Sequence, residues 1–143
     1  SISSVPESDS ILDNDIDIRL ITGPEILAGS TRLKAGTATK MALNIISTSV
    51  MIKLGKVYNN RMIDLSVSND KLMDRAIGIL FDIGSVDRET AVQLLKKTNG
   101  SVKLSLLIAL SGLDVIEAKQ LLIDSKGNLR SALITVKSNW VLV

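Results

Sequence analysis

Residues able to bind an anion gather in the stretch GPEILAGSTRLKAGTATK, which begins at Gly23. The proline-free sequence that follows predicts a helix from Ser30 to Leu54. A helix N-terminus presents unpaired backbone N–H groups and a partial positive charge. The hydroxyls of Ser30 and Thr31 and the ammonium group of Lys34 would lie beside these groups. Phosphate or carboxylate is the ligand that such a cradle would hold.

Helical geometry places part of this polar cluster on the face that should be buried. The predicted buried stripe comprises Ala38, Met41, Ala42, Ile45 and Ile46. At about 100° per residue, Ser30, Lys34 and Thr37 lie on the same side of the helix as this stripe. Arg32 points about 200° away from Ser30. A buried polar group without a partner costs about 1–3 kcal/mol, and a buried charge costs more. We therefore expect a polar ligand against this face.

Plainer interpretations of the same residues stay open. Ser30 can simply cap the helix while Lys34 extends into solvent, and the order of residues is not that of a P-loop. The preceding Thr22-Gly23-Pro24-Glu25 has the form of a capping box, which predicts a short helical turn ending near Gly29. Glu25 is either the partner in that capping box or a residue that contacts the ligand.

The composition excludes several kinds of chemistry. The chain has no cysteine and no histidine, which removes disulfides, thiol nucleophiles, imidazole bases and the usual zinc ligands. We expect no metal site and no cofactor, so that catalysis would depend on carboxylates, lysine, tyrosine or hydroxyl groups. The net charge is only +2, the basic residues are scattered, and aromatic residues make up 2% of the chain. Nucleic acid is therefore not an expected partner.

Membrane and secretion signals are also missing from the sequence. The longest apolar run, LSLLIAL at 104–110, is much shorter than the roughly 20 residues of a membrane-spanning helix. The first residues, SISSVPESDS, lack the basic start and apolar middle of a signal peptide. We expect a cytoplasmic protein without a membrane partner.

Two short strands are predicted before the anion-binding stretch. SISSV at 1–5 is strand-like and is followed by the turn signal Pro6-Glu7-Ser8-Asp9, and DIDIRLI at 15–21 alternates between polar and apolar residues. An isolated pair of strands is marginally stable in water. The sheet is therefore expected to be incomplete within this chain.

An irregular or strand-like connector at 56–68 is predicted to lead to a region of short amphipathic helices. The first helix covers about 69–82, and a repeat with an offset of 27 residues follows. The repeated residues are Asp87, Ala91, Gln93, Leu94, Leu95 and Gly100, which recur as Asp114, Ala118, Gln120, Leu121, Leu122 and Gly127. Each unit is predicted to be an Asp-capped helix, a glycine stop and a second helix that starts at Ser101 or Asn128. A compact bundle of about five helices is expected.

The stretch GPEILAGSTRLKAGTATKMALNIIST resembles the signature segment of the N-acetylmuramic acid 6-phosphate etherases and the related glucokinase regulatory proteins. The resemblance continues through MIKLGKVYNNRMIDL, VDRETAVQLL and GSVKLSLLIALSGLD, and omits the final SNWVLV. It implies an α/β fold in which residues 1–66 are the C-terminal part of a doubly wound sugar isomerase (SIS) domain that binds phosphosugars. Residues 67–143 would form a small all-α helical bundle whose helix pairs resemble those of ubiquitin-associated (UBA) domains.

The resemblance also implies an activity. Etherases of this family are lyases of cell-wall amino-sugar recycling, which cleave the D-lactyl ether of N-acetylmuramic acid 6-phosphate to N-acetylglucosamine 6-phosphate and D-lactate. They open the sugar ring, remove the C2 proton, eliminate lactate from C3 and add water, which is chemistry that carboxylates can catalyse. The matched positions that would bind the phosphorylated amino sugar are Glu25, Ser30, Thr31, Lys34 and Thr37.

The catalytic carboxylates are expected upstream of Ser1, so the chain alone should be inactive. The resemblance further implies a homodimer with a shared active site. Two other functions stay open. One is a phosphosugar-sensing regulatory protein of the glucokinase-regulator type, which would bind without turnover and would lack the paired acidic residues upstream. The other is a stand-alone helical interaction module formed by residues 67–143.

Overall fold

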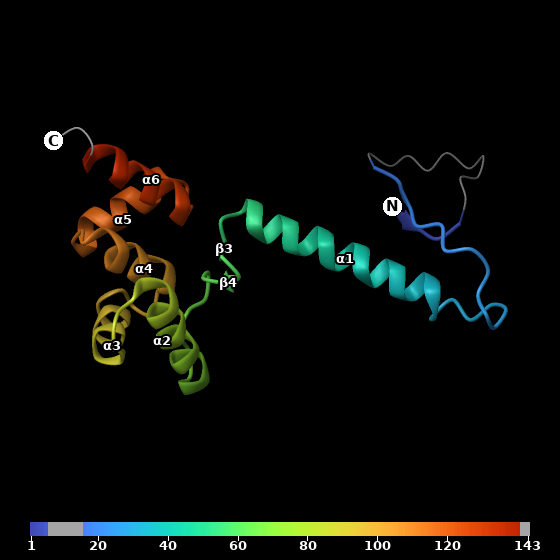
Figure 1. The fold of residues 1–143 in the computed structure, drawn as a ribbon, viewed down its shortest axis with the longest axis horizontal. Helices are drawn as coiled ribbons and strands as arrows, with labels where there is room; N and C mark the ends of the chain where they lie inside the picture. Colours follow the sequence, from blue (N-terminus) through green and yellow to red (C-terminus); the bar gives the residue numbers. More distant parts are fainter. Residues whose placement is uncertain (6–15, 141–143) are drawn as a thin grey trace. The chain divides into compact units, whose positions relative to one another are not determined.

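The computed structural model describes residues 1–5 and 16–140. The predicted turn at 6–9 and the last three residues of SNWVLV lie outside the described residues. The chain divides into two compact units, residues 1–50 and 51–143, which we call the N-terminal unit and the helical unit (Figure 1). The described chain is mostly helical and contains two small sheets of two strands each, which gives it α/β character.

The sheet of the N-terminal unit joins β1 (Ile2–Ser3) and β2 (Ile18–Arg19) in parallel. The backbone N–H of Leu20 donates to the carbonyl of Ser3 at 2.8 Å. Both predicted extended segments are confirmed, but only two residues of each belong to a strand.

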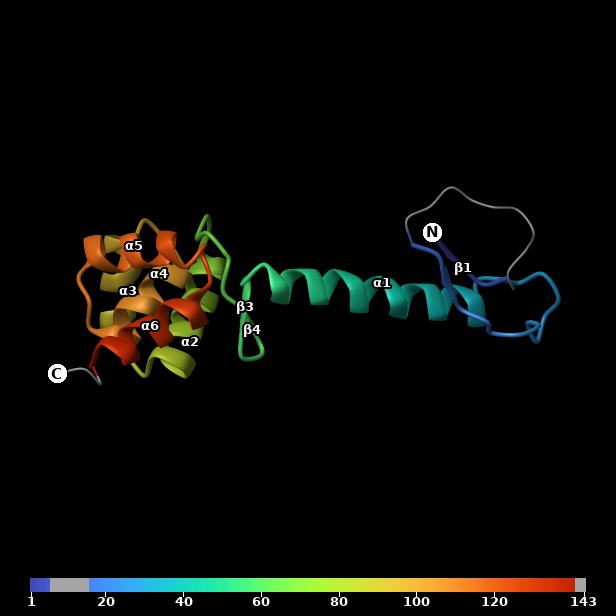
Figure 2. The same cartoon turned by 90° about the horizontal axis from the view of Figure 1, so that it is seen from above.

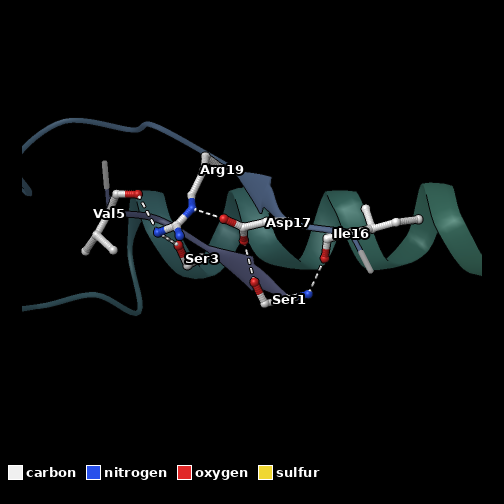
Figure 3. A network of polar contacts seen from close by, with 6 residues as sticks. All are labelled: Ser1, Ser3, Val5, Ile16, Asp17 and Arg19. Carbon is white, nitrogen blue, oxygen red and sulfur yellow. Dashed lines mark hydrogen bonds and ion pairs between the residues drawn. The ribbon is translucent and has the colours of Figure 1, made fainter. Parts of the chain in front are cut away.

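A polar network surrounds this strand pair (Figure 3). The Arg19 guanidinium donates to the Asp17 carboxylate at 2.5 Å and to the Ser3 hydroxyl at 3.0 Å. The Ser1 hydroxyl donates to the same carboxylate. Asp17 therefore links the residue that precedes β1 to one that lies in β2.

Helix α1 spans Lys34–Lys53, so the predicted start at Ser30 is wrong. Residues 31–33 form a turn that precedes the helix. The helix ends where Gly55 adopts a left-handed conformation, with φ +66°, and the backbone N–H of Lys56 donates to the carbonyl of Met51 at 3.0 Å. This is the hydrogen bond of a glycine-terminated helix.

A hairpin follows, where the sequence predicted an irregular or strand-like connector. Strand β3 (Val57–Tyr58) pairs with β4 (Arg61–Met62) in antiparallel fashion, and Asn59 between them has φ +51°. The next residue, Ile63, is fully buried in the core of the helical unit. The two strands agree with the strand-like alternative, but their pairing was not predicted because strands of two residues carry no readable periodicity.

Five helices complete the helical unit and confirm the predicted bundle. They are α2 (Asp70–Gly84), α3 (Arg88–Lys97), α4 (Val102–Ser111), α5 (Val115–Asp124) and α6 (Leu129–Trp140). Helix α4 packs against each of the other four, and both views show it among them (Figures 1 and 2). It has the most apolar sequence of the five helices. Most residues of its first two turns are buried.

Corresponding positions of the 27-residue repeat make matching hydrogen bonds. Asp87 and Asp114 each accept a hydrogen bond of 2.8 Å from the backbone N–H three residues later. Gly100 and Gly127 have φ +77° and +73°, and each donates its N–H to the carbonyl five residues earlier, at 2.7 and 2.8 Å. The two helix pairs therefore turn their corners with the same backbone geometry.

The core of the helical unit lies between α4 and its neighbours. Its largest fully buried side chains are Ile63, Ile79, Leu80, Leu95, Val102, Leu106, Leu107 and Leu129. The hydroxyls of Thr98 and Ser105 are also buried and hydrogen-bond to each other at 2.7 Å. Gly84 allows α2 to approach α4, because a Cβ atom at this position would lie 3.2 Å from the Cβ of Ala109.

Candidate functional site

The candidate anion-binding stretch forms a tight turn before α1, and none of its first residues is helical. Gly29 has φ +80°, which favours glycine, and the backbone N–H of Leu33 donates to the carbonyl of Ser30 at 3.1 Å. The N–H of Gly36 donates to the carbonyl of Thr31 at 2.7 Å. A Cβ atom on Gly36 would lie 3.2 Å from this same oxygen. Gly36 therefore permits the close approach between the turn and the helix.

Glu25 caps α1 from nine residues before its start. Its two carboxylate oxygens accept hydrogen bonds from the backbone N–H groups of Lys34 and Ala35, both at 3.0 Å. The hydrogen bond from Ala35, followed by that from Lys34, holds the pKa of Glu25 below its usual value. The predicted capping box at residues 22–25, with its own helical turn, is wrong, because Glu25 caps a different helix.

This cap changes what the helix N-terminus can offer a ligand. The N–H groups of Lys34 and Ala35 belong to the cradle that the sequence predicted for an anion, and they are already bonded to the Glu25 carboxylate. A ligand at this turn would meet mainly side chains. The structure therefore gives Glu25 a role that neither of its two predicted interpretations included, the cap of α1.

The other predicted site residues are separated by the start of the helix. Ser30 and Thr31 lie in the turn, whereas Lys34 and Thr37 lie in the first turn of α1, three residues apart and hence on one side of it. The prediction that Ser30 shares this helical face is wrong, because Ser30 is not part of the helix. The Thr37 hydroxyl donates to the Leu33 carbonyl at 2.7 Å.

Lys34 is exposed, and its ammonium group forms no ion pair with any residue that the structure describes. Its charge also acts on the nearby Glu25 carboxylate, where it helps to lower the pKa. Arg32, which was predicted to point elsewhere, is also exposed.

The predicted buried stripe of α1 is not buried within the described chain. Met41, Ile45 and Ile46 are 60%, 64% and 40% exposed, and α1 has no buried residue. The prediction is wrong because no other described segment packs over these side chains. The burial argument for a polar ligand does not apply to the described chain alone.

A shallow groove of about 620 Å³ lies beside this turn, within the N-terminal unit. Thr31 is the one predicted site residue among those that line it. The lining also includes Ser4, Val5, Ala35, Gly36, Thr39, Lys40, Leu43 and Asn44. The sequence analysis missed Thr39, Lys40 and Asn44, although the i, i+4 spacing of Lys40 and Asn44 places them on one side of a helix.

A second charged site joins the hairpin to α4 in the helical unit. The Asp64 carboxylate forms ion pairs with the ammonium groups of Lys56 and Lys103, with N–O distances of 3.0 and 3.2 Å. The hydrogen bond from Lys56 contributes most to lowering the pKa of Asp64. Lys103 is mostly buried, with 12% of its side chain exposed. These residues are far apart in the sequence, so no local pattern marked them.

Within residues 1–5 and 16–140, no three acidic side chains come together in a way that could hold a metal ion. None of the described helices has both the length and the apolar composition needed to cross a bilayer.

Part of the chain matches a known protein family. Residues 59–103 match the protein-family model described as the C-terminal lid domain of glucokinase regulatory protein. This segment runs from the β3–β4 turn to the first residues of α4.

Curated relatives match almost the whole chain. A protein of Prochlorococcus marinus (strain NATL1A) named N-acetylmuramic acid 6-phosphate etherase is 91% identical over 139 residues, which cover 97% of this chain and 45% of the relative. Proteins of the same name from Parasynechococcus marenigrum (strain WH8102) and Nostoc punctiforme are 58% and 52% identical, over 92% and 96% of this chain and 42% and 45% of the relatives. The chain spans about half the length of the curated relatives it matches, and over that span it is similar to proteins named N-acetylmuramic acid 6-phosphate etherase.

Proposed function

We propose that the complete protein cleaves the D-lactyl ether of N-acetylmuramic acid 6-phosphate, giving N-acetylglucosamine 6-phosphate and D-lactate. The observation that carries this proposal is the 91% identity, over 97% of the chain, to a relative that bears this name. In this reaction the C2–H and C3–O bonds break, lactate leaves with the electron pair of the C3–O bond, and water then adds at C3. The net reaction consumes one water molecule.

The role that we assign to the present chain is binding of the phosphorylated amino sugar. Ser30, Thr31, Lys34 and Thr37 form the binding set, in which the exposed ammonium group of Lys34 pairs with the phosphate. Glu25 acts by fixing the start of α1, through its bonds to the N–H groups of Lys34 and Ala35. The acid–base carboxylates belong to a part of the protein outside this chain, so the chain alone is inactive.

We also propose the architecture of the complete protein. Residues 1–66 belong to a doubly wound sugar isomerase (SIS) domain, and residues 67–143 form a small helical domain with UBA-like helix pairs. The parallel pairing of β1 with β2 and the exposed apolar side chains of α1 support the first assignment, since a helix of a doubly wound fold is covered by its sheet. The active site is shared between the subunits of a cytoplasmic homodimer.

Incubation of the complete protein with N-acetylmuramic acid 6-phosphate tests the activity directly. We expect stoichiometric D-lactate, measured with a lactate dehydrogenase assay, and N-acetylglucosamine 6-phosphate, measured by mass spectrometry. A folded protein that releases no D-lactate would refute the proposal.

The binding role is tested by a matched pair of variants of the complete protein. Lys34→Ala should weaken phosphosugar binding by about tenfold or more, because a charge-assisted hydrogen bond is lost. Arg32→Ala, two residues away and also exposed, should change the affinity less than about threefold. Equal losses in titration calorimetry would contradict the assignment of Lys34.

A second candidate is a phosphosugar-sensing regulatory protein that binds without turnover. The match of residues 59–103 to the lid domain of glucokinase regulatory protein favours it. Saturable binding of a phosphosugar, together with no detectable D-lactate release, would identify this function in place of the etherase activity.

A further inference from the structure

A groove of about 690 Å³ lies in the helical unit, at the corner between α3 and α4 and alongside α5. It belongs to neither of the charged sites described above. Its lining comprises Lys97, Thr98, Asn99, Ser101, Leu104, Val115, Lys119, Leu122, Ile123 and Gly127. The groove is therefore formed by the corner of the first helix pair and the first helix of the second pair.

One side of the groove is apolar. Val115, Leu122 and Ile123 lie at i, i+7 and i+8 on α5 and so share one face of that helix. Leu104 of α4 also lines the groove but is only 9% exposed. Ile123 is 61% exposed, although it is a large apolar residue. Burial of this surface by a partner would be favourable.

Two cations border the apolar surface. Lys97 ends α3, and Lys119 lies on the same face of α5 as Val115, four residues later. No acidic side chain is among the lining residues, and neither lysine forms an ion pair with a carboxylate in the part of the chain that the structure describes. The groove thus offers apolar surface together with unneutralised positive charge.

Comparison of the two units of the repeat shows that the backbone geometry of the corner does not by itself produce the apolar and positively charged lining of the groove. The two corners have the same backbone hydrogen bonds. At the offset of 27 residues, however, Lys97 corresponds to Asp124 and Leu104 corresponds to Ser131. The second corner therefore has an anion in place of Lys97 and a polar residue in place of Leu104, while a lysine, Lys126, stands in place of Asn99.

We propose that this groove binds a short peptide segment of a partner protein, in which apolar side chains are flanked by aspartate or glutamate. The apolar residues would cover Leu104, Val115, Leu122 and Ile123, while the carboxylates would pair with Lys97 and Lys119. Charge complementarity of this kind sets the orientation and specificity of the partner. A nucleic acid fits less well, because two cations and no aromatic side chain line the groove.

Fluorescence anisotropy on the 143-residue chain tests the proposal with synthetic probes. The probe is a dye-labelled peptide of twelve residues with leucine at positions 3, 6, 7 and 10 and glutamate at most of the others. A second peptide replaces every glutamate with glutamine, and a labelled oligonucleotide of twelve nucleotides is the third probe. The acidic peptide should bind at least about tenfold more tightly than the other two, and its affinity should fall as salt increases.

Paired variants identify the groove as the binding site. Lys97→Gln combined with Lys119→Gln should weaken binding of the acidic peptide about three- to tenfold and reduce its salt dependence. The control combines Lys71→Gln with Lys96→Gln, two exposed lysines that do not line the groove, and should change the affinity less than twofold. Ile123→Ser should also weaken binding. Equal losses in both double variants, no preference for the acidic peptide, or tighter binding of the oligonucleotide would each overturn the proposal.

Discussion

The N-terminal unit and the helical unit both contain abundant isoleucine, leucine and valine, but they bury them very differently. None of the described residues among the first 50 is buried. In the helical unit, Ile79, Leu80, Leu106 and Leu107 are almost completely shielded from solvent. Apolar composition and helical spacing predict which face of a helix can be buried, whereas the presence of other packed segments decides whether it is buried.

The two units also differ in how their hydrogen bonds are distributed along the chain. In the helical unit, Asn69, Asp87, Ser101 and Asp114 each cap the helix that follows them. In the N-terminal unit, α1 is capped by Glu25 from nine residues away, and the sheet has only two residues in each strand. Local caps and a shared core make a cooperative unit, while an uncovered helix depends on its own marginal stability.

The largest predicted effect contrasts one leucine of the bundle with one isoleucine of α1. Leu106→Ala in the fully buried position should lower the free energy of unfolding of the helical unit by about 2–5 kcal/mol, because it removes apolar contacts and leaves a cavity. Ile45→Ala should change it by less than about 0.5 kcal/mol, because the side chain is exposed. Urea denaturation followed by circular dichroism measures both. Similar losses would show that α1 is packed into the same cooperative unit.

Two glycines of α2 provide a smaller contrast within the bundle. Gly84→Ala should destabilise the helical unit by about 1–2 kcal/mol, because the new Cβ would lie 3.2 Å from the Cβ of Ala109 on α4. Gly78→Ala should stabilise it by up to about 1 kcal/mol, since no atom lies within 4 Å of the new Cβ and alanine favours the helix. Thermal denaturation of the two variants should move the midpoint in opposite directions. A stabilising Gly84→Ala would contradict the close packing of α2 on α4.

The capping residues of the repeat should have effects of intermediate size. Asp114→Ala removes hydrogen bonds to the N–H groups of Ile116 and Glu117 and disrupts the capping box, so that about 1 kcal/mol of stability should be lost. Lys119→Ala in the middle of the same helix should change stability by less than about 0.5 kcal/mol. Chemical denaturation that shows no difference between the two would contradict the capping role.

The smallest predicted effect concerns the pH dependence of Asp87. The hydrogen bond from the backbone of Thr90 contributes most to lowering the pKa of this carboxyl below 3.8. A carboxyl with a lowered folded-state pKa stabilises the fold above its unfolded-state value, and the contribution disappears as the pH falls through the folded-state value. Asp87→Asn keeps an N-cap acceptor without the charge. Its stability should therefore fall less steeply below about pH 4 than that of the parent chain, and parallel curves in acid titration would refute this.

The bundle was largely predictable because its signals are local. Asp87 and Asp114 lie three residues before the N–H groups that they accept from, and Gly100 and Gly127 supply the left-handed positions that end the first helices. Such signals act within one or two turns of chain and so can be read directly from the sequence. The capping aspartate and the terminating glycine occur in both 27-residue units, which made the helix pairs recognisable.

The start of α1 and its surroundings were less predictable because they depend on distant residues. Ser30 has the chemistry of a cap, but the cap is the Glu25 carboxylate, which the intervening turn returns to the helix. The pairing of β3 with β4 was not predicted, because the strands are too short to show alternation and the burial of Ile63 is a tertiary contact. Of the candidate site residues, Lys34 and Thr37 lie on one side of α1 as predicted, whereas Ser30 lies outside the helix.

Native-state hydrogen exchange on the 143-residue chain tests the difference between the two units most directly. The backbone N–H groups of Leu106 and Leu107 in α4 should be protected to nearly the global free energy of unfolding of the bundle. Those of Ile45 and Ile46 in α1 should exchange at least about 100-fold faster, because no described segment covers that helix. Equal protection of the two helices would show that α1 belongs to the same cooperative unit as the bundle and would contradict this account.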